Sequence, residues 1–512
     1  MTSGAASAVA IAAVCVVTLV LGSFGLRVSR TTRDFYVAGR SVSAGWNASA
    51  IGGEYLSAAS FLGIAGLVYA FGVDMLWFPV GYTVGYLVLL VLVAAPLRRS
   101  GAYTLPDFAE LRLESLAVRR LAALLVVGIG WLYLLPQFQG AGLALSTVAG
   151  VPPGLGSAIV AVVVLLSVVA GGMRSITLVQ AVQYWIKLTA IAVPAFVLVA
   201  LWARSGGPAP VLDGSADWGR ALSGFGGREH PVYATYSTIL ALCFGTMGLP
   251  HVLVRFYTNP DGRAARRTTL VVIGLLGIFY LFTPVYGVLG RVFLPTLPAG
   301  TRSDSVTLLL PGAMAPGTLG TVLSAVLAGG AFAAFLSTAS GLTISIAGVL
   351  DQDLLGRRVQ RRVGGDASRI QTFRLAAVVA VAVPYAASWL TPNVSLADTV
   401  GLAFAVAAST FCPLLVLGVW WRRLSVAGAM AGLLTGGVLA LTATTMTVLG
   451  ASASVGGGWV GALLAQPAAW TVPIAFAVTV LVSYASPSRV PAGTARTLVR
   501  LHAPEDLGTP TP

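Results

Sequence analysis

Long apolar stretches alternate with short polar gaps along almost the whole chain. An α-helix needs about 20 mostly apolar residues to cross the hydrocarbon core of a bilayer, and these stretches reach that length. The chain is therefore expected to be an all-α polytopic membrane protein with about 13 transmembrane helices. The predicted segments are 6–28, 44–70, 75–96, 120–149, 154–172, 177–203, 233–254, 268–291, 315–349, 372–390, 396–420, 425–449 and 463–486.

Basic residues concentrate in every second gap between these segments. With the N-terminus outside, 25 of the 31 Lys and Arg residues fall in cytoplasmic gaps or in the tail, five fall outside and one lies within a helix. Cytoplasmic loops carry an excess of Lys and Arg, so the pattern predicts a multi-pass protein of the cell membrane with a cytoplasmic C-terminus. The opposite orientation would place one strongly basic loop outside, with Arg357, Arg358, Arg361, Arg362, Arg369 and Arg374.

Composition agrees with this class, because the chain is 57% hydrophobic and only 9% charged. The net charge of +14 does not indicate a nucleic-acid partner, since the arginines are spread over short loops beside membrane ends. No GxxxxGK[ST] sequence is present, which argues against ATP-driven transport. The sequence also gives no sign of an obligatory protein partner or of an organic cofactor.

A polytopic chain without an energy-coupling domain is typical of a secondary transporter. A membrane enzyme is the weaker alternative, because the three histidines (His230, His251 and His502) are scattered and no nucleophile–base pair is evident. Polar residues and helix breakers at membrane depth distinguish these classes.

The second segment carries such residues in mid-span. Gly52 and Gly53 precede Glu54, and Ser57 and Ser60 follow it. A discontinuous helix would expose backbone carbonyls that coordinate small cations, and an intramembrane acid is a functional candidate by default. The glycines alone are equally consistent with close helix packing.

The ninth segment has two adjacent hydroxyls, on Ser337 and Thr338, after a run of small residues. Two hydroxyl oxygens and freed carbonyls would make the all-oxygen site that hard cations prefer. The alternative is that both hydroxyls bond to carbonyls of their own helix.

Several longer stretches carry a family resemblance. They are DFYVAGRSVSAGWNASAIGGEYLSAASFLGIAGLVYAFG from Asp34, GLPHVLVRFYT from Gly248, AFLSTASGLTISIAGVLDQDLL from Ala334, GLAFAVAAST from Gly401 and WWRRLSVAGAMAG from Trp420. In these stretches the chain resembles the sodium/solute symporters, and within them the acetate permease (cation–acetate symporter) branch.

The resemblance implies a leucine-transporter-like core of two inverted five-helix repeats. The division would be an extra helix and loop at 1–43, the repeats at 44–203 and 204–420, two more helices at 421–486 and a cytoplasmic tail at 487–512. The family's sodium site would fall on the carbonyls of Gly53, Leu56 and Ala334 and on the hydroxyls of Ser337 and Thr338. Those residues lie on the two segments that the polar pattern had singled out.

The chain departs from the family pattern in the sixth segment. Many members have an acid there, at the position where this chain has Gln180. A residue that would neutralise a second cation is therefore missing. Glu54 lies one residue from an acidic position of the proline branch, so that role is not carried over to it.

Lys187, the only lysine, lies within the same segment. A bare charge at the bilayer centre costs roughly 2.5–3.5 kcal/mol, so this lysine is expected to face the bundle interior. It could be the counter-ion of a substrate carboxylate, pair with Glu54, or stand in for a cation near the ion site and exchange a proton. A snorkelling or structurally paired lysine is the other interpretation.

The function that follows is a symporter that couples uptake of a small carboxylate (acetate, propionate or pyruvate) to entry of Na⁺ or H⁺ by alternating access. The carboxylate is implied by the resemblance; another solute, or a membrane sensor, remains an alternative. Arg255 is interpreted as an anchor at the cytoplasmic end, because it begins a basic run. The candidates for substrate binding or coupling are Glu54, Ser57, Ser60, Gln137, Gln139, Gln180, Lys187 and His251.

Overall fold

The computed structural model describes residues 3–28, 42–210, 216–224, 229–355, 366–391, 395–450 and 458–503. All regular elements in these ranges are helical, as the sequence predicts. The first half contains α1 (Ser3–Val28), α3 (Ala44–Tyr55), η2 (Ala59–Gly63), α4 (Ile64–Phe71), η3 (Gly72–Leu76), α5 (Trp77–Leu92), α6 (Ala94–Ser100), α7 (Leu105–Leu113), α8 (Leu116–Ala149), α9 (Pro153–Arg204) and α10 (Pro231–Gly245). The second half contains α11 (Pro250–Phe256), α12 (Gly262–Tyr280), α13 (Thr283–Phe293), α14 (Val306–Met314), α15 (Thr318–Val349), η8 (Leu350–Leu355), α17 (Asp366–Ser388), α18 (Leu396–Trp420), α19 (Val426–Val448), α21 (Trp459–Ala465), α22 (Ala468–Ala485) and α23 (Thr494–His502).

Within the described ranges, 11 helical stretches are long and apolar enough to cross a membrane, or 12 if the bent pair α10–α11 is one span. The bent pair corresponds to the seventh predicted segment, and the remaining difference of one from the predicted 13 has a simple cause. The second and third predicted segments join into one continuous helical stretch, Ala59–Leu92, which turns at Gly72. Gly72 has a φ of +75°, a conformation that glycine adopts without strain.

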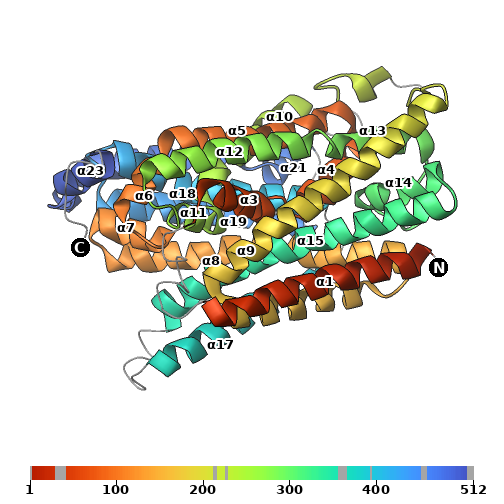
Figure 1. Ribbon diagram of the computed structural model, residues 1–512. Helices are drawn as coiled ribbons and strands as arrows, with labels where there is room; N and C mark the ends of the chain where they lie inside the picture. Colours follow the sequence, from red (N-terminus) through yellow and green to blue (C-terminus); the bar gives the residue numbers. More distant parts are fainter. Residues whose placement is uncertain are drawn as a thin grey trace.

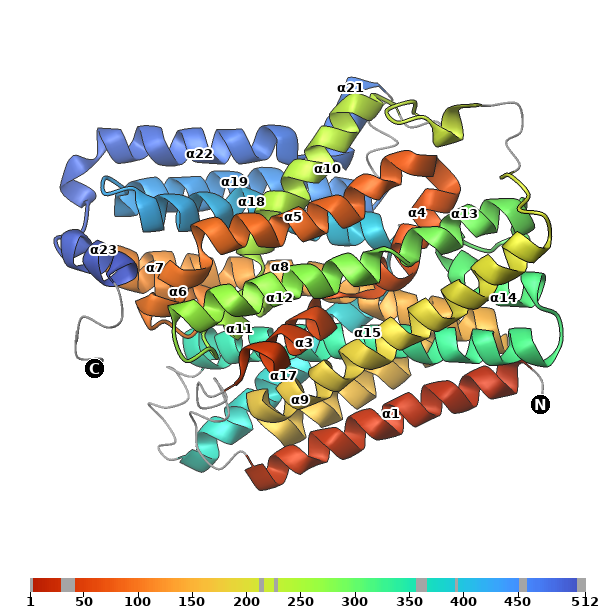
Figure 2. The same ribbon diagram turned by 45° about the horizontal axis from the view of Figure 1, so that its top comes forward.

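The bundle has a buried centre and an exposed rim. In the most apolar 18-residue stretch of each helix, 78% of the residues are buried for α15 and 83% for α18, against 22% for α1. Figure 2 shows α1 along one edge of the bundle and α22 along the opposite edge. The peripheral position of these helices agrees with their predicted place outside the two repeats, a division that stays a prediction.

Figure 1 shows that α1 begins at one end of the bundle and that α23 lies at the other. That arrangement fits an odd number of crossings, as the predicted orientation requires. The motif residues Asp34–Arg40 and the loop arginines Arg357, Arg358, Arg361 and Arg362 lie outside the described residues.

Short helices occupy gaps that the sequence pattern leaves polar. Helix α7 begins after Thr104, whose hydroxyl accepts a hydrogen bond from the N–H of Asp107, and Pro106 stands in its first turn. Helix α23 packs against α6 and α7. These helices thicken the end of the bundle that is predicted to be cytoplasmic.

Two membrane helices are broken near the centre of the bundle. The two breaks lie close together, since α3 and α11, which flank them, are in contact. Helix α3 ends at Tyr55, and Leu56 is non-helical, with φ −73° and ψ 87°. The second break, between α10 and α11, bends the chain by 47°. Leu249 is extended there because Pro250 follows it, and the residue before a proline disfavours the helical region.

Candidate functional site

The break after α3 frees backbone carbonyls, and each of them has a donor. The carbonyls of Gly53 and Leu56 accept hydrogen bonds from Lys187. The Glu54 carbonyl accepts from the Thr338 hydroxyl at 2.6 Å, and the Tyr55 carbonyl accepts from the Tyr133 hydroxyl at 3.4 Å. The unwound backbone is thus satisfied by side chains of α8, α9 and α15, as buried polar groups require.

Lys187 lies at the centre of this arrangement and is fully buried. Helix α9 contains two candidate spans, Pro153–Met173 and Ser175–Arg204. Lys187 is about 18 Å along the second span from Ser175, near its middle. Its Nζ donates to the Gly53 carbonyl, to the Leu56 carbonyl at 2.8 Å and to the Ser337 hydroxyl at 2.9 Å. The expectation that Lys187 faces the interior holds, and the snorkelling interpretation is wrong for this residue.

The structure also shows why α3 and α9 approach so closely here. A Cβ atom at Gly53 would overlap the carbonyl oxygen of Gln180. A Cβ atom at Gly341 of α15 would overlap the carboxylate of Glu54. Both glycines allow the three helices to meet, so the predicted close packing and the predicted polar site occur together.

The five residues of the implied sodium site converge around Lys187. Besides the contacts already given, the Ser337 hydroxyl donates to the Ala334 carbonyl at 3.1 Å. The two hydroxyls therefore divide their roles, since Ser337 bonds within its own helix whereas Thr338 bonds to the broken helix α3. Their role in holding an ion stays a prediction.

Glu54 does not pair with Lys187, one of the three roles considered for that lysine. Its carboxylate accepts from Arg255 at 2.7 Å instead, and Arg255 is 1% exposed. Arg255 also donates to the Thr177 hydroxyl at 2.5 Å and to the side-chain oxygen of Gln180. The interpretation of Arg255 as an anchor at the membrane surface is wrong, because the bend before Pro250 turns α11 and this side chain into the bundle.

Gln180 connects the residues around Lys187 with the Glu54–Arg255 pair. Its amide nitrogen donates to the Ser337 carbonyl at 2.8 Å, while its oxygen accepts from Arg255. A neutral amide can donate and accept at the same time, whereas a carboxylate at this position could only accept. The residue that departs from the family pattern is therefore a structural bridge between the Lys187 site and the Glu54–Arg255 pair.

A cluster of aromatic rings lies on the other side of the α3 break, and we call it the tyrosine cluster. Neighbouring ring centroids are 4.8–5.9 Å apart, and the rings come from α3, α5, α8, α11, α12 and α18. Its members are Tyr55, Tyr82, Tyr86, Tyr133, His251, Tyr280 and Phe404.

Several polar atoms of this region have no hydrogen-bond partner within the described part of the chain. They are the hydroxyls of Ser57, Tyr82 and Tyr86 and both ring nitrogens of His251. All four residues are buried, with 1% exposure or less. Leaving a buried polar group without a partner costs about 1–3 kcal/mol, so a ligand that supplied partners here would gain free energy.

The other predicted candidates take structural positions. Ser60 hydrogen-bonds the Tyr280 hydroxyl at 2.9 Å, at the edge of the tyrosine cluster. Gln137 accepts from the N–H of Ala58 at 3.0 Å and so caps the resumed helix. Gln139 donates to Thr391, away from the cluster.

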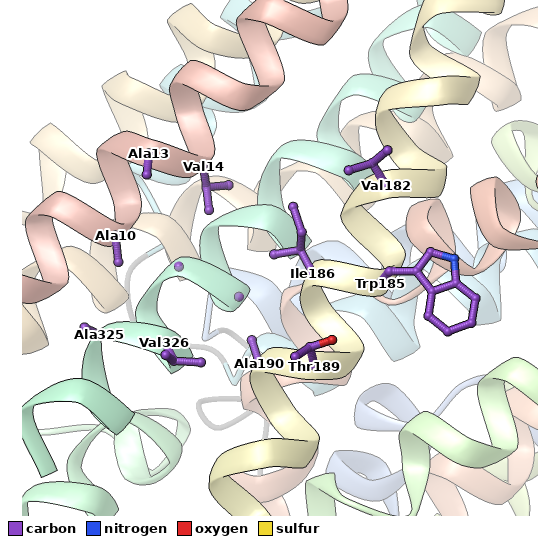
Figure 3. Close-up of a pocket in the computed structure, with 12 residues that line it drawn as sticks. Ala10, Ala13, Val14, Val182, Trp185, Ile186, Thr189, Ala190, Ala325 and Val326 are labelled. Carbon is purple, nitrogen blue, oxygen red and sulfur yellow. The ribbon is translucent and has the colours of Figure 1, made fainter. Parts of the chain in front are cut away.

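A groove on the flank of the bundle is apolar. It has a volume of about 640 Å³ and lies between α1, α9 and α15, as Figure 3 shows. On α9 it is lined by Val182, Trp185, Ile186 and Thr189, whereas Gln180 and Lys187 point from the opposite helical face. A groove of this chemistry on the membrane-facing side suits acyl chains rather than a polar solute.

Two smaller cavities lie at the end of the bundle that carries α7. They share Tyr103 and Gln352 in their walls and have volumes of about 20 and 370 Å³. The smaller one reaches Val254, the neighbour of Arg255. The larger one is bordered by Arg119, whose guanidinium contacts Asp107, Glu110 and Asp353 and so ties together α7, α8 and η8.

The tyrosine cluster was not among the sequence candidates, apart from His251 and the neighbouring Ser57 and Ser60. One signal was present, since Tyr82 and Tyr86 are four residues apart in an apolar helix and therefore share a face. The other rings come from distant segments, and no spacing in the sequence connects them.

Residues 35–436 match the profile of the sodium:solute symporter family. The chain is 32% identical over 431 residues to the "uncharacterized symporter YwcA" of Bacillus subtilis (strain 168), with 84% of each chain covered. It also matches a solved Na⁺-coupled sialic acid symporter in its substrate-bound outward-open state, with a TM-score of 0.71, 15% identity and 94% and 97% of the two chains covered.

A second solved structure, the nucleobase-cation-symport-1 family transporter Mhp1 in a closed conformation, matches with a TM-score of 0.51 and 14% identity over 91% and 98% of the two chains. At such identities the similarity shows the fold alone. That fold is the leucine-transporter-like one, so the predicted fold class is confirmed.

Proposed function

The chain belongs to the sodium:solute symporter family, and we propose that it takes up a small monocarboxylate such as acetate, propionate or pyruvate together with a sodium ion or a proton. The family and the fold are those of membrane transporters, not of enzymes. Transport would proceed by alternating access, with the solute and the cation bound on the two sides of the α3 break.

One observation carries the proposal: several buried polar atoms in and beside the tyrosine cluster have no hydrogen-bond partner among the described residues. The hydroxyls of Tyr82, Tyr86 and Ser57 can each donate to an acceptor. The two oxygens of a carboxylate accept several such bonds, and charge-assisted bonds of this kind are the stronger ones.

The charges around the break favour an anion over a neutral solute. Lys187 and Arg255 carry one positive charge each when protonated, and Glu54 carries one negative charge. One excess positive charge remains before any coupling ion binds, and a monoanion neutralises it.

The direction of transport rests on the predicted orientation. The distribution of arginines favours a cell-membrane protein whose N-terminus is outside and whose C-terminus is cytoplasmic. In that orientation the cavities beside α7 lie at the cytoplasmic end of the bundle, and the smaller one is lined in part by Val254.

The test is uptake of radiolabelled pyruvate into vesicles of the purified protein, with inward sodium and proton gradients applied together. Pyruvate is preferred to acetate because undissociated acetic acid crosses lipid unaided. The expected result is accumulation above the outside concentration, absent from protein-free vesicles and inhibited by unlabelled acetate and propionate. Accumulation of an amino acid or a sugar, but of no monocarboxylate, would assign another solute; binding without accumulation would favour a sensor.

A further inference from the structure

The family's sodium site does not fit a sodium ion in this chain. We infer that the ammonium group of Lys187 takes the place of that ion, so that the protein works without binding sodium between α3 and α15. The inference deepens the proposed function and rests on it only for the statement that a cation belongs at this position.

The three donors of the ammonium match three acceptors. An ammonium group has three N–H bonds and no acceptor. Lys187 Nζ is bonded to the carbonyls of Gly53 and Leu56 and to the hydroxyl oxygen of Ser337. A metal ion bound by these oxygens would coincide with the nitrogen, and two positive charges at that separation repel strongly.

The two remaining residues of the implied site are also engaged. The Thr338 hydroxyl donates to the Glu54 carbonyl, and the Ala334 carbonyl accepts from Ser337. The missing negative charge also argues against a bound sodium ion. Gln180 is neutral, and it stands at the position where the family pattern has an acid that would compensate a second cation. Glu54, the acid that lies at the break, is bonded to Arg255.

A cation attached to the chain has one consequence for transport. It holds the broken helix against α15 as a bound ion would, but it is not released to the cytoplasm. A sodium gradient therefore supplies no energy through this site. Removing the lysine side chain, in contrast, leaves a cradle of oxygen atoms that a sodium ion can enter.

The test is equilibrium binding of radioactive sodium to the purified protein without any solute. The variants are Lys187→Ala, which vacates the cradle, and Lys187→Ala with Ser337→Ala, which also removes one of its oxygens. We expect no saturable sodium binding to the unmodified protein, one saturable ion in Lys187→Ala and a loss of that binding in the double variant. Replacing sodium by choline should lower the melting temperature of Lys187→Ala only.

Saturable sodium binding to the unmodified protein would overturn the inference, whether or not any variant folds. A folded Lys187→Ala protein that binds no sodium would overturn it as well, because the cradle would then not be a cation site. Neither result depends on the transported solute. Failure of monocarboxylate uptake would therefore remove the proposed substrate and leave this inference intact.

Discussion

On one side of the α3 break, the carbonyls of Gly53, Glu54, Tyr55 and Leu56 all accept hydrogen bonds from side chains. On the other side, the hydroxyls of Tyr82 and Tyr86 and the ring of His251 have no partner in the part of the chain described. Both sides are equally buried, so burial does not explain the difference. A satisfied site holds its own cation, whereas an unsatisfied one is complementary to a ligand that comes from solution.

The largest effect is expected where the satisfied side depends on a buried ion pair. Glu54→Gln leaves Arg255 without its counter-charge, and breaking a buried pair in this way costs about 3–5 kcal/mol. Thermal unfolding of the purified protein in detergent measures the loss. The double variant Glu54→Gln with Arg255→Gln is the control and should be more stable than Glu54→Gln alone; equal stability of wild type and Glu54→Gln would show that the pair is not formed.

Lys187→Met should affect transport more than folding. The variant removes the charge held by the Gly53 and Leu56 carbonyls while keeping a side chain of similar volume. Hydrogen bonds to charged groups contribute about 1.5–3 kcal/mol each, and a loss of about 3 kcal/mol corresponds to roughly a hundredfold slower uptake. Unchanged uptake kinetics, measured at equal amounts of folded protein, would return Lys187 to a structural role.

Tyr86→Phe examines the unsatisfied side. Its hydroxyl has no partner among the described residues, so the free energy of unfolding should change by less than about 0.5 kcal/mol. Affinity for the carboxylate should fall about tenfold, as expected for a lost hydrogen bond to a charged group. Equilibrium binding measures the affinity, and thermal unfolding measures the stability. A large loss of stability with unchanged affinity would show that the Tyr86 hydroxyl supports the fold and does not bind the carboxylate.

Thr338→Ala and Ser337→Ala provide the matched changes on the satisfied side. Each removes a hydroxyl that is bonded, to the Glu54 carbonyl or to Lys187, so each should lower stability by about 1 kcal/mol. Neither variant should change the response of uptake to sodium, because Lys187 keeps the cation position in both. A loss of sodium-dependent uptake in either variant would show that these hydroxyls hold a sodium ion in the unmodified protein.

The amino-acid pattern predicts the membrane segments, the break after α3 and the family, because apolar length, Gly52-Gly53 and the family motifs are local signals. It also brings Lys187 to notice, since a lysine at membrane depth is costly. The sequence left the partner of that lysine open among three alternatives, because Lys187 lies 131 residues from Leu56 and 150 from Ser337. Arg255 was misinterpreted because its position depends on the direction of a bend, which sequence spacing does not contain.

The central claim is that the satisfied side needs no sodium while the unsatisfied side binds a carboxylate. Pyruvate uptake into vesicles tests both parts at once when a proton gradient and a sodium gradient are applied separately, with Lys187→Met vesicles as the control. The account predicts accumulation in sodium-free buffer under the proton gradient, and none in Lys187→Met. Accumulation by the unmodified protein that requires sodium and ignores the proton gradient would contradict it.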